Sequence, residues 1–137
     1  MTADVAVISS RTAAPRNPAT QGRHLHPAAL PQWRALLGSR WQERLERVTE
    51  LSLAYYRAEE DAADPGRSPS ARRDARREAA QIRRRTVSQR RDLAEIEAAL
   101  SRLATGRFGW CEQCGMGIGA ARLTAGPAGR YCAACDS

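Results

Sequence analysis

The chain has 137 residues, of which 42% are hydrophobic and only one is Phe, and its mean hydropathy is -0.56. These values exclude a large globular core, so we expect one elongated unit with a tail. The net charge of +7 comes from 22 basic residues that are all Arg, and it favours acidic partners, nucleic acid among them, without identifying one. No run approaches the ~18 apolar residues of a membrane helix, and no apolar signal segment is present. We therefore expect a cytoplasmic protein with reduced thiols and no membrane association.

Residues 1–30 mix Ala, Pro, Ser, Thr and Arg without a helical or strand period. Pro15, Pro18 and Pro27 interrupt any helix that begins there, so a disordered tail is predicted for residues 1–30. His24 and His26 fall in this tail, and we expect them to be solvated rather than to bind a metal.

Two long helices are predicted after the tail. The first, over residues 31–63, carries one apolar stripe of Trp33, Leu37, Trp41, Leu45, Val48 and Tyr55, widened by Leu36, Leu51 and Leu53. A turn follows, because Pro65 disfavours a helical Asp64 and Gly66 can adopt a positive φ. Ser68 is then expected to cap a second helix over residues 69–105, ended by Gly106.

The second helix has a heptad seam, in which the steps after the first residue alternate between four and three. Its members are Ala75, Ala79, Ile82, Thr86, Gln89, Leu93, Ile96, Leu100 and Leu103. Both stripes are buried only if the helices fold back on each other, with Leu37 facing Ile96 and Tyr55 facing Ala79. The fold class is therefore mainly α, an antiparallel coiled-coil hairpin over residues 31–106. Thr86 and Gln89 either fix the register or are merely tolerated.

Nine arginines lie on the second helix away from the seam. They are either a solvated surface partly paired with acids or a basic surface for acidic protein or nucleic-acid backbone. This helix has no aromatic residue to stack on bases, so base-specific recognition is not expected. The nine are Arg72, Arg73, Arg76, Arg77, Arg83, Arg84, Arg85, Arg90 and Arg91.

All four cysteines lie in two CxxC pairs separated by seventeen residues, Cys111 with Cys114 and Cys132 with Cys135. Four thiolates complete a tetrahedron around one zinc ion and leave no site for water, which indicates a structural ion. A thiol redox switch is the alternative, but no βαβ pattern surrounds the pairs. No nucleophile and base pair or phosphate loop is visible, so an enzyme is not expected.

The stretch from Leu100 to Cys135 resembles the finger of the DksA/TraR family of transcription regulators. The resemblance includes the spacer and seven residues that are not cysteines: Gly109, Glu112, Gly115, Ile118, Arg122, Leu123 and Pro127. It implies a zinc finger over residues 107–137 and a monomer that binds RNA polymerase directly, without sequence-specific DNA binding. Family members insert the coiled-coil tip into the secondary channel and so modulate initiation. The family's tip motif, Asp-x-x-Asp-x-Ala, falls on Asp61, Asp64 and Gly66, with Gly in place of Ala.

Two departures from the family limit what the resemblance implies. Basic positions that relatives use toward the alarmone ppGpp fall on Ser88 and Glu95, so no alarmone response is predicted. Only two residues follow Cys135, so we expect no counterpart of the C-terminal helix of many relatives. Two alternative functions remain: a zinc-stapled coiled-coil adaptor for another acidic protein or nucleic acid, and direct nucleic-acid binding by the finger. The second is disfavoured because the finger loop, residues 116–131, carries only Arg122 and Arg130 as charges.

Overall fold

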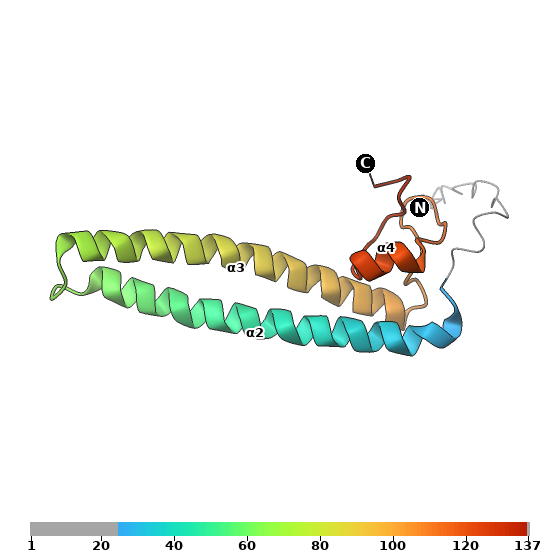
Figure 1. Cartoon of the computed structure of the whole chain (residues 1–137), viewed down its shortest axis with the longest axis horizontal. Coiled ribbons are helices and arrows are strands. Elements are labelled where there is room, and N and C mark those ends of the chain that lie inside the picture. Colours follow the sequence, from blue (N-terminus) through green and yellow to red (C-terminus); the bar gives the residue numbers. More distant parts are fainter. Residues whose placement is uncertain (1–24, 137) are drawn as a thin grey trace, which may run out of the picture.

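The computed structural model describes residues 25–136, which form a long helical hairpin with a small finger at one end (Figure 1). A short 3-10 helix, η1 (Pro27–Ala29), leads directly into α2 (Leu30–Ala63). A tight turn follows, then α3 (Pro69–Ala104), a looped segment, and the short helix α4 (Ala120–Ala125). The turn between α2 and α3 lies at the end of the molecule opposite the finger (Figure 1). Within residues 25–136 the β-structure is limited to one isolated bridge, between Trp110 and Gly117.

The predicted ends of the two helices are confirmed, with one correction. Ser68 caps α3 by accepting a hydrogen bond from the amide of Ala71, and Pro69 occupies the first turn. Gly106 follows the end of α3 with a φ of 74°, as a C′ glycine should. The expectation of a positive φ at Gly66 is wrong, because the positive-φ glycines among the described residues do not include it. Its amide instead donates to Oδ1 of Asp64 at 2.9 Å, so an aspartate side chain closes the turn.

Polar contacts between α2 and α3 confirm the antiparallel pairing. The indole Nε1 of Trp41 donates to Glu97 at 3.1 Å near the finger end, and Arg83 donates to the hydroxyl of Tyr55 at 3.4 Å further out. Arg44 donates to Gln89 Oε1 at 2.9 Å across the middle of the seam. Gln89 therefore makes a contact that depends on register, whereas Thr86 hydrogen-bonds its own helix at the carbonyl of Ile82.

Every residue of the predicted α3 seam is buried or half-buried. The burial forms two clusters rather than one continuous core. One, toward the turn, contains Leu51, Ala58, Ala79 and Ile82, with Tyr55 against it. The other lies where the helix bases meet the finger and includes Leu37, Ile96 and Ala99. Leu53 was placed in the α2 stripe but is 55% exposed, and the stripe instead continues to Ala58, which is buried.

The tail predicted over residues 1–30 needs a correction at its end. Residues 1–24, including His24, lie outside the described part of the chain. Leu25, however, is 4% exposed and belongs to the core at the finger. His26 caps η1, since its Nδ1 accepts a hydrogen bond from the amide of Ala28 at 3.1 Å. The folded part therefore begins before α2, because the finger provides an apolar surface that the sequence of this segment does not reveal.

Across residues 25–136, none of the helices has the length and apolar character needed to cross a membrane. Both long helices carry charged residues throughout, on the sides away from the seam.

Candidate metal centre

The four cysteines come together in the finger. The Sγ atoms of Cys111, Cys114, Cys132 and Cys135 all lie within 4.8 Å of one another. The Sγ atoms of Cys114 and Cys132, from different CxxC pairs, are 3.6 Å apart. A tetrahedron with zinc–sulfur bonds of about 2.3 Å has sulfur–sulfur edges of roughly 3.8 Å, so this spacing fits one ion held by all four.

Backbone hydrogen bonds shape both knuckles. The amide of Gly115 donates to the carbonyl of Cys111 at 2.9 Å, and the amide of Cys111 donates to Met116 at 2.7 Å. In the second pair, the amides of Cys135 and Asp136 both donate to the carbonyl of Cys132. Each CxxC turn is therefore closed by main-chain contacts that aim its two sulfurs at the same point.

The pKa values of the thiols indicate whether this cluster suits a cation. Burial acts to raise the pKa of Cys111, but backbone hydrogen bonds from Cys114, Cys132 and Gln113 bring it down to about 6. Hydrogen bonding to Cys132 raises the pKa of Cys135 to about 12. The cluster therefore favours one thiolate, at Cys111, and opposes a second negative charge beside it. A divalent cation removes that conflict, so the donor set fits a structural zinc ion.

The finger shares its core with the bases of both helices. Phe108, 3% exposed, lies 5.9 Å from Trp33 of α2, measured between ring centroids, and belongs to the same buried cluster as Leu37 and Leu123. Gly109 has a φ of 85°, and a Cβ there would lie 2.9 Å from the Cδ1 atom of Leu25. The finger therefore packs against α2, α3 and the segment before η1 together, and the zinc ion holds a unit that is already part of the hydrophobic core.

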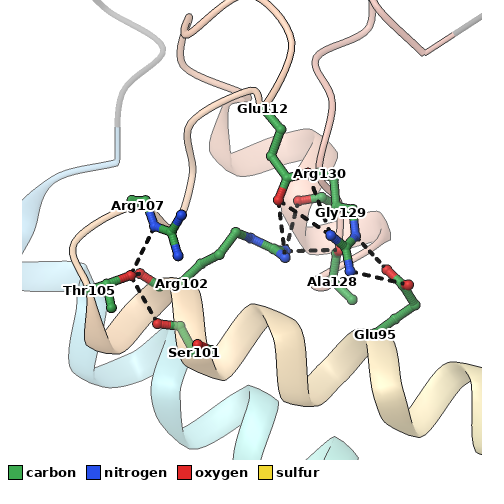
Figure 2. Close-up of polar contacts among 9 residues, drawn as sticks. All are labelled: Glu95, Ser101, Arg102, Thr105, Arg107, Glu112, Ala128, Gly129 and Arg130. Atoms are coloured by element: carbon green, nitrogen blue, oxygen red, sulfur yellow. Dashed lines mark hydrogen bonds and ion pairs between the residues drawn. The ribbon is translucent and has the colours of Figure 1, made fainter. Parts of the chain in front are cut away.

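A chain of charged side chains fixes the finger to α3 (Figure 2). Arg102 is 5% exposed and donates through Nη2 to the carbonyls of Ala128 at 3.2 Å and Gly129 at 3.5 Å. Its Nη1 has no hydrogen-bond partner within residues 25–136 but lies 3.7 Å from Glu112 Oε1. Burial lowers the pKa of Arg102 from its ordinary value, and the nearby positive charge of Arg130 lowers it further.

Arg130 completes this chain. Its Nε donates to Glu95 Oε2 at 2.8 Å and its Nη1 donates to Glu112 Oε1 at 3.4 Å, so it joins α3 to the first knuckle (Figure 2). The hydrogen bond from Arg130 lowers the pKa of Glu95. Sequence reasoning did not assign Arg102 and Arg130 this role, because a heptad pattern predicts burial of apolar seam positions and Arg102 lies beside the seam.

The tip residues lie far from the metal centre, at the turn between α2 and α3 (Figure 1). Asp61 and Asp64 share one partner that sequence analysis did not identify. Arg67 donates from Nη2 to Asp61 Oδ1 at 2.8 Å, and its Nε lies 3.9 Å from Asp64 Oδ2. All three side chains are between 41% and 50% exposed, so both carboxylates reach solvent while an arginine neutralises part of their charge.

Ser88 and Glu95 lie on α3, and Arg122 lies in the finger loop. Ser88 is exposed on α3, and Glu95 is engaged with Arg130. The second charged residue of the finger loop, Arg122, donates to the carbonyl of Tyr131 at 3.0 Å and pairs with Asp136. Both loop arginines therefore already bind groups of the finger or of α3.

Comparison with known proteins supports the same relationship from two directions. Residues 106–136 match the family model for the prokaryotic dksA/traR C4-type zinc finger. The fold is similar to a solved structure titled transcription factor DksA2 from Pseudomonas aeruginosa, with a TM-score of 0.69 and 26% sequence identity. That match covers 77% of this chain and 78% of the other. None of the curated proteins compared with the sequence matched it.

The family model accounts for the finger, and the structural match extends over the hairpin that carries it. The four clustered cysteines supply the ligand set of that finger. A dksA/traR-type C4 zinc finger, with the ligand set for one structural zinc ion, stands here at the base of a hairpin similar to that of transcription factor DksA2, and the two matches together support the DksA/TraR family for this chain.

Proposed function

We propose that this protein binds RNA polymerase directly and acts through the tip of its hairpin, inserted into the secondary channel, to modulate initiation. The observation that carries the proposal is the separation of the two ends: a zinc-held base, and a narrow turn bearing Asp61 and Asp64 at the far end of two helices of 34 and 36 residues (Figure 1). At a rise of about 1.5 Å per residue, such helices extend roughly 50 Å. That is a suitable length for reaching into a channel while the finger stays outside.

The chemistry of the tip supports an electrostatic action. Two exposed carboxylates three residues apart can approach a basic loop or alter a nearby magnesium site. Arg67 holds both in a common orientation. An exposed ion pair of this kind is worth only about 0–1 kcal/mol, so exchange of Arg67 for a stronger cationic partner costs little. The ligand roles of Cys111, Cys114, Cys132 and Cys135 belong to the same proposal, since zinc sets the base from which the tip extends. The chain carries out no catalysis itself.

In-vitro transcription with the cognate polymerase tests the proposal. Asp61→Asn combined with Asp64→Asn should leave polymerase binding nearly intact and abolish the effect on transcription. The matched control is Glu59→Gln with Glu60→Gln, which removes the same charge from two exposed neighbours on α2. A transcription effect that survives the aspartate change, or disappears equally in the control, would show that the tip assignment is wrong.

A pull-down with core polymerase at moderate salt separates this proposal from the alternative of an adaptor for another acidic partner. Association with polymerase that needs the hairpin supports the first. If the zinc-loaded chain does not associate, the polymerase proposal fails and the adaptor function, which rests on the arginines of α3, takes its place.

A further inference from the structure

The middle of the hairpin carries a strongly basic surface that the proposed function does not use. Residues 51–58 of α2 and residues 79–91 of α3 contain six arginines and no acidic residue. On α3 the six include Arg83, Arg84, Arg90 and Arg91, all exposed. Of the nine arginines named in the sequence, only Arg77 has an ion pair among residues 25–136, with Asp74 at 3.6 Å. Most of this positive charge is therefore not neutralised by acidic side chains of the described chain.

This basic surface also contains apolar groups. A groove of about 280 Å³ runs between the helices, lined by Tyr55 and Tyr56 of α2 and by Arg83, Val87 and Arg90 of α3. Tyr56 is 67% exposed and Val87 is 56% exposed. Exposed apolar side chains gathered in one groove indicate an interaction surface more strongly than single ones scattered over a molecule. The sequence of α3 alone does not reveal this groove, because its aromatic residues come from α2.

The groove is also structurally ordered. The guanidinium carbon of Arg83 lies 5.8 Å from the centroid of the Tyr55 ring, and its Nη2 donates to the hydroxyl of the same residue at 3.4 Å. The ring of Tyr56 packs edge-on against Tyr55 with centroids 6.0 Å apart. Arginine and tyrosine are, with tryptophan, the residue types enriched among those that contribute most to binding energy at protein interfaces, and here they already contact one another without a partner.

The spacing of the arginines indicates the shape of the partner. They occur as pairs at Arg76 and Arg77, Arg83 and Arg84, and Arg90 and Arg91, separated by seven residues each time. Seven residues span two helical turns, so the pairs repeat about every 10.5 Å along α3. A second helix laid along the hairpin repeats its own side chains at the same interval. A flexible single strand of nucleic acid has no such constraint, and it gains little from an exposed valine.

We propose that the groove formed by Tyr55, Tyr56, Arg83, Val87 and Arg90 binds an acidic amphipathic helix of a partner protein, laid lengthwise along the hairpin. The acidic residues of that helix pair with the repeated arginines, and its apolar residues fill the groove beside Val87. The proposal does not require the partner to be RNA polymerase.

The test uses the full-length, zinc-loaded protein and synthetic ligands. The first is a helical peptide of about four heptads with two glutamates and one leucine per heptad at constant positions. The second has the same composition with the glutamates and leucines scrambled, and the third is a single-stranded RNA of about 20 nucleotides. Affinity is measured by fluorescence anisotropy. The heptad peptide should bind at least about tenfold more tightly than the scrambled one, and more tightly than the RNA.

Variants locate the surface. Arg83→Gln with Arg90→Gln should weaken binding of the heptad peptide at least about tenfold, and Val87→Ser should remove most of the preference over the scrambled peptide. The control is Arg34→Gln with Arg40→Gln, which removes the same charge from exposed positions of α2 nearer the finger and should change affinity less than about twofold.

Three results would overturn the proposal. Equal affinity for the two peptides would mean that the surface attracts negative charge without recognising a helix. Absence of binding to either peptide would mean that the groove does not bind acidic amphipathic helices. Tighter binding of the RNA, weakened by the change at Arg83 and Arg90, would assign the surface to nucleic acid instead.

Discussion

Truncation of Arg102 to alanine should loosen the finger from α3 while leaving the hairpin helical. The side chain is 6% exposed and donates hydrogen bonds to the carbonyls of Ala128 and Gly129. A hydrogen bond from a charged donor contributes about 1.5–3 kcal/mol, and removal of one member of a buried ion pair costs about 3–5 kcal/mol. The true cost lies below the sum of these values, because Glu112 keeps Arg130 as a partner and the burial penalty of Arg102 disappears with it.

We expect a net loss of about 2–3 kcal/mol, which increases opening of the finger roughly 30- to 150-fold. Hydrogen exchange of the amides of Gly129 and Glu112, which donate to the carbonyls of Gly126 and Arg130, measures that opening directly, and the rate of zinc transfer to a chelator reports it independently. Arg102→Met should cost less than Arg102→Ala, since methionine fills much of the volume that alanine leaves as a cavity.

The matched control is Arg107→Ala. Arg107 is exposed and its side chain donates to the hydroxyl of Thr105 at 3.1 Å, so its loss should cost less than about 0.5 kcal/mol. If the rates of hydrogen exchange and zinc transfer in Arg102→Ala match those in the control, Arg102 does not fasten the finger to α3.

Three further predictions concern the same end of the molecule. Cys114→Ser should lower bound zinc below one ion per chain, measured by metal analysis, and destabilise the hairpin base, because binding and folding of the finger are coupled; loss of zinc with unchanged thermal stability would contradict that coupling. Leu37→Ala should cost about 2–4 kcal/mol in denaturant unfolding, since Leu37 is fully buried between both helices and the finger; the exposed Leu53→Ala is its control, and equal effects would argue against the two-cluster core. Glu95→Gln should lower stability at neutral pH by no more than about 1 kcal/mol. Because Arg130 lowers the pKa of Glu95, this contribution is present above the ordinary value of 4.5 and lost as the pH falls through the folded value, so the two unfolding curves should converge in acid. A gap that persists there would mean that Glu95 acts by packing.

The pairing of α2 with α3 was predictable because it depends on periodicity. A seam with alternating steps of four and three can be buried only against a second helix, and the short turn at Pro65 leaves no partner except α2. The packing of Leu37 with Ile96 and of Tyr55 with Ala79 follows from that rule. The zinc site was predictable for a similar reason, since two CxxC turns restrict the geometry of four thiolates to one ion.

Other contacts join elements whose sequences show no common hydrophobic periodicity, and only the tertiary structure decides these. Arg67 reaches both tip carboxylates only once the turn is formed, and Leu25 is buried only because Gly109 lets the finger backbone approach it. The groove at Tyr56 and Val87 exists because two helices place an aromatic pair beside an arginine stripe. Local sequence therefore determined the helices, their seam and the metal ligands, whereas long-range packing decided how the finger is fastened, how the tip charges are paired and which surface remains free for a partner.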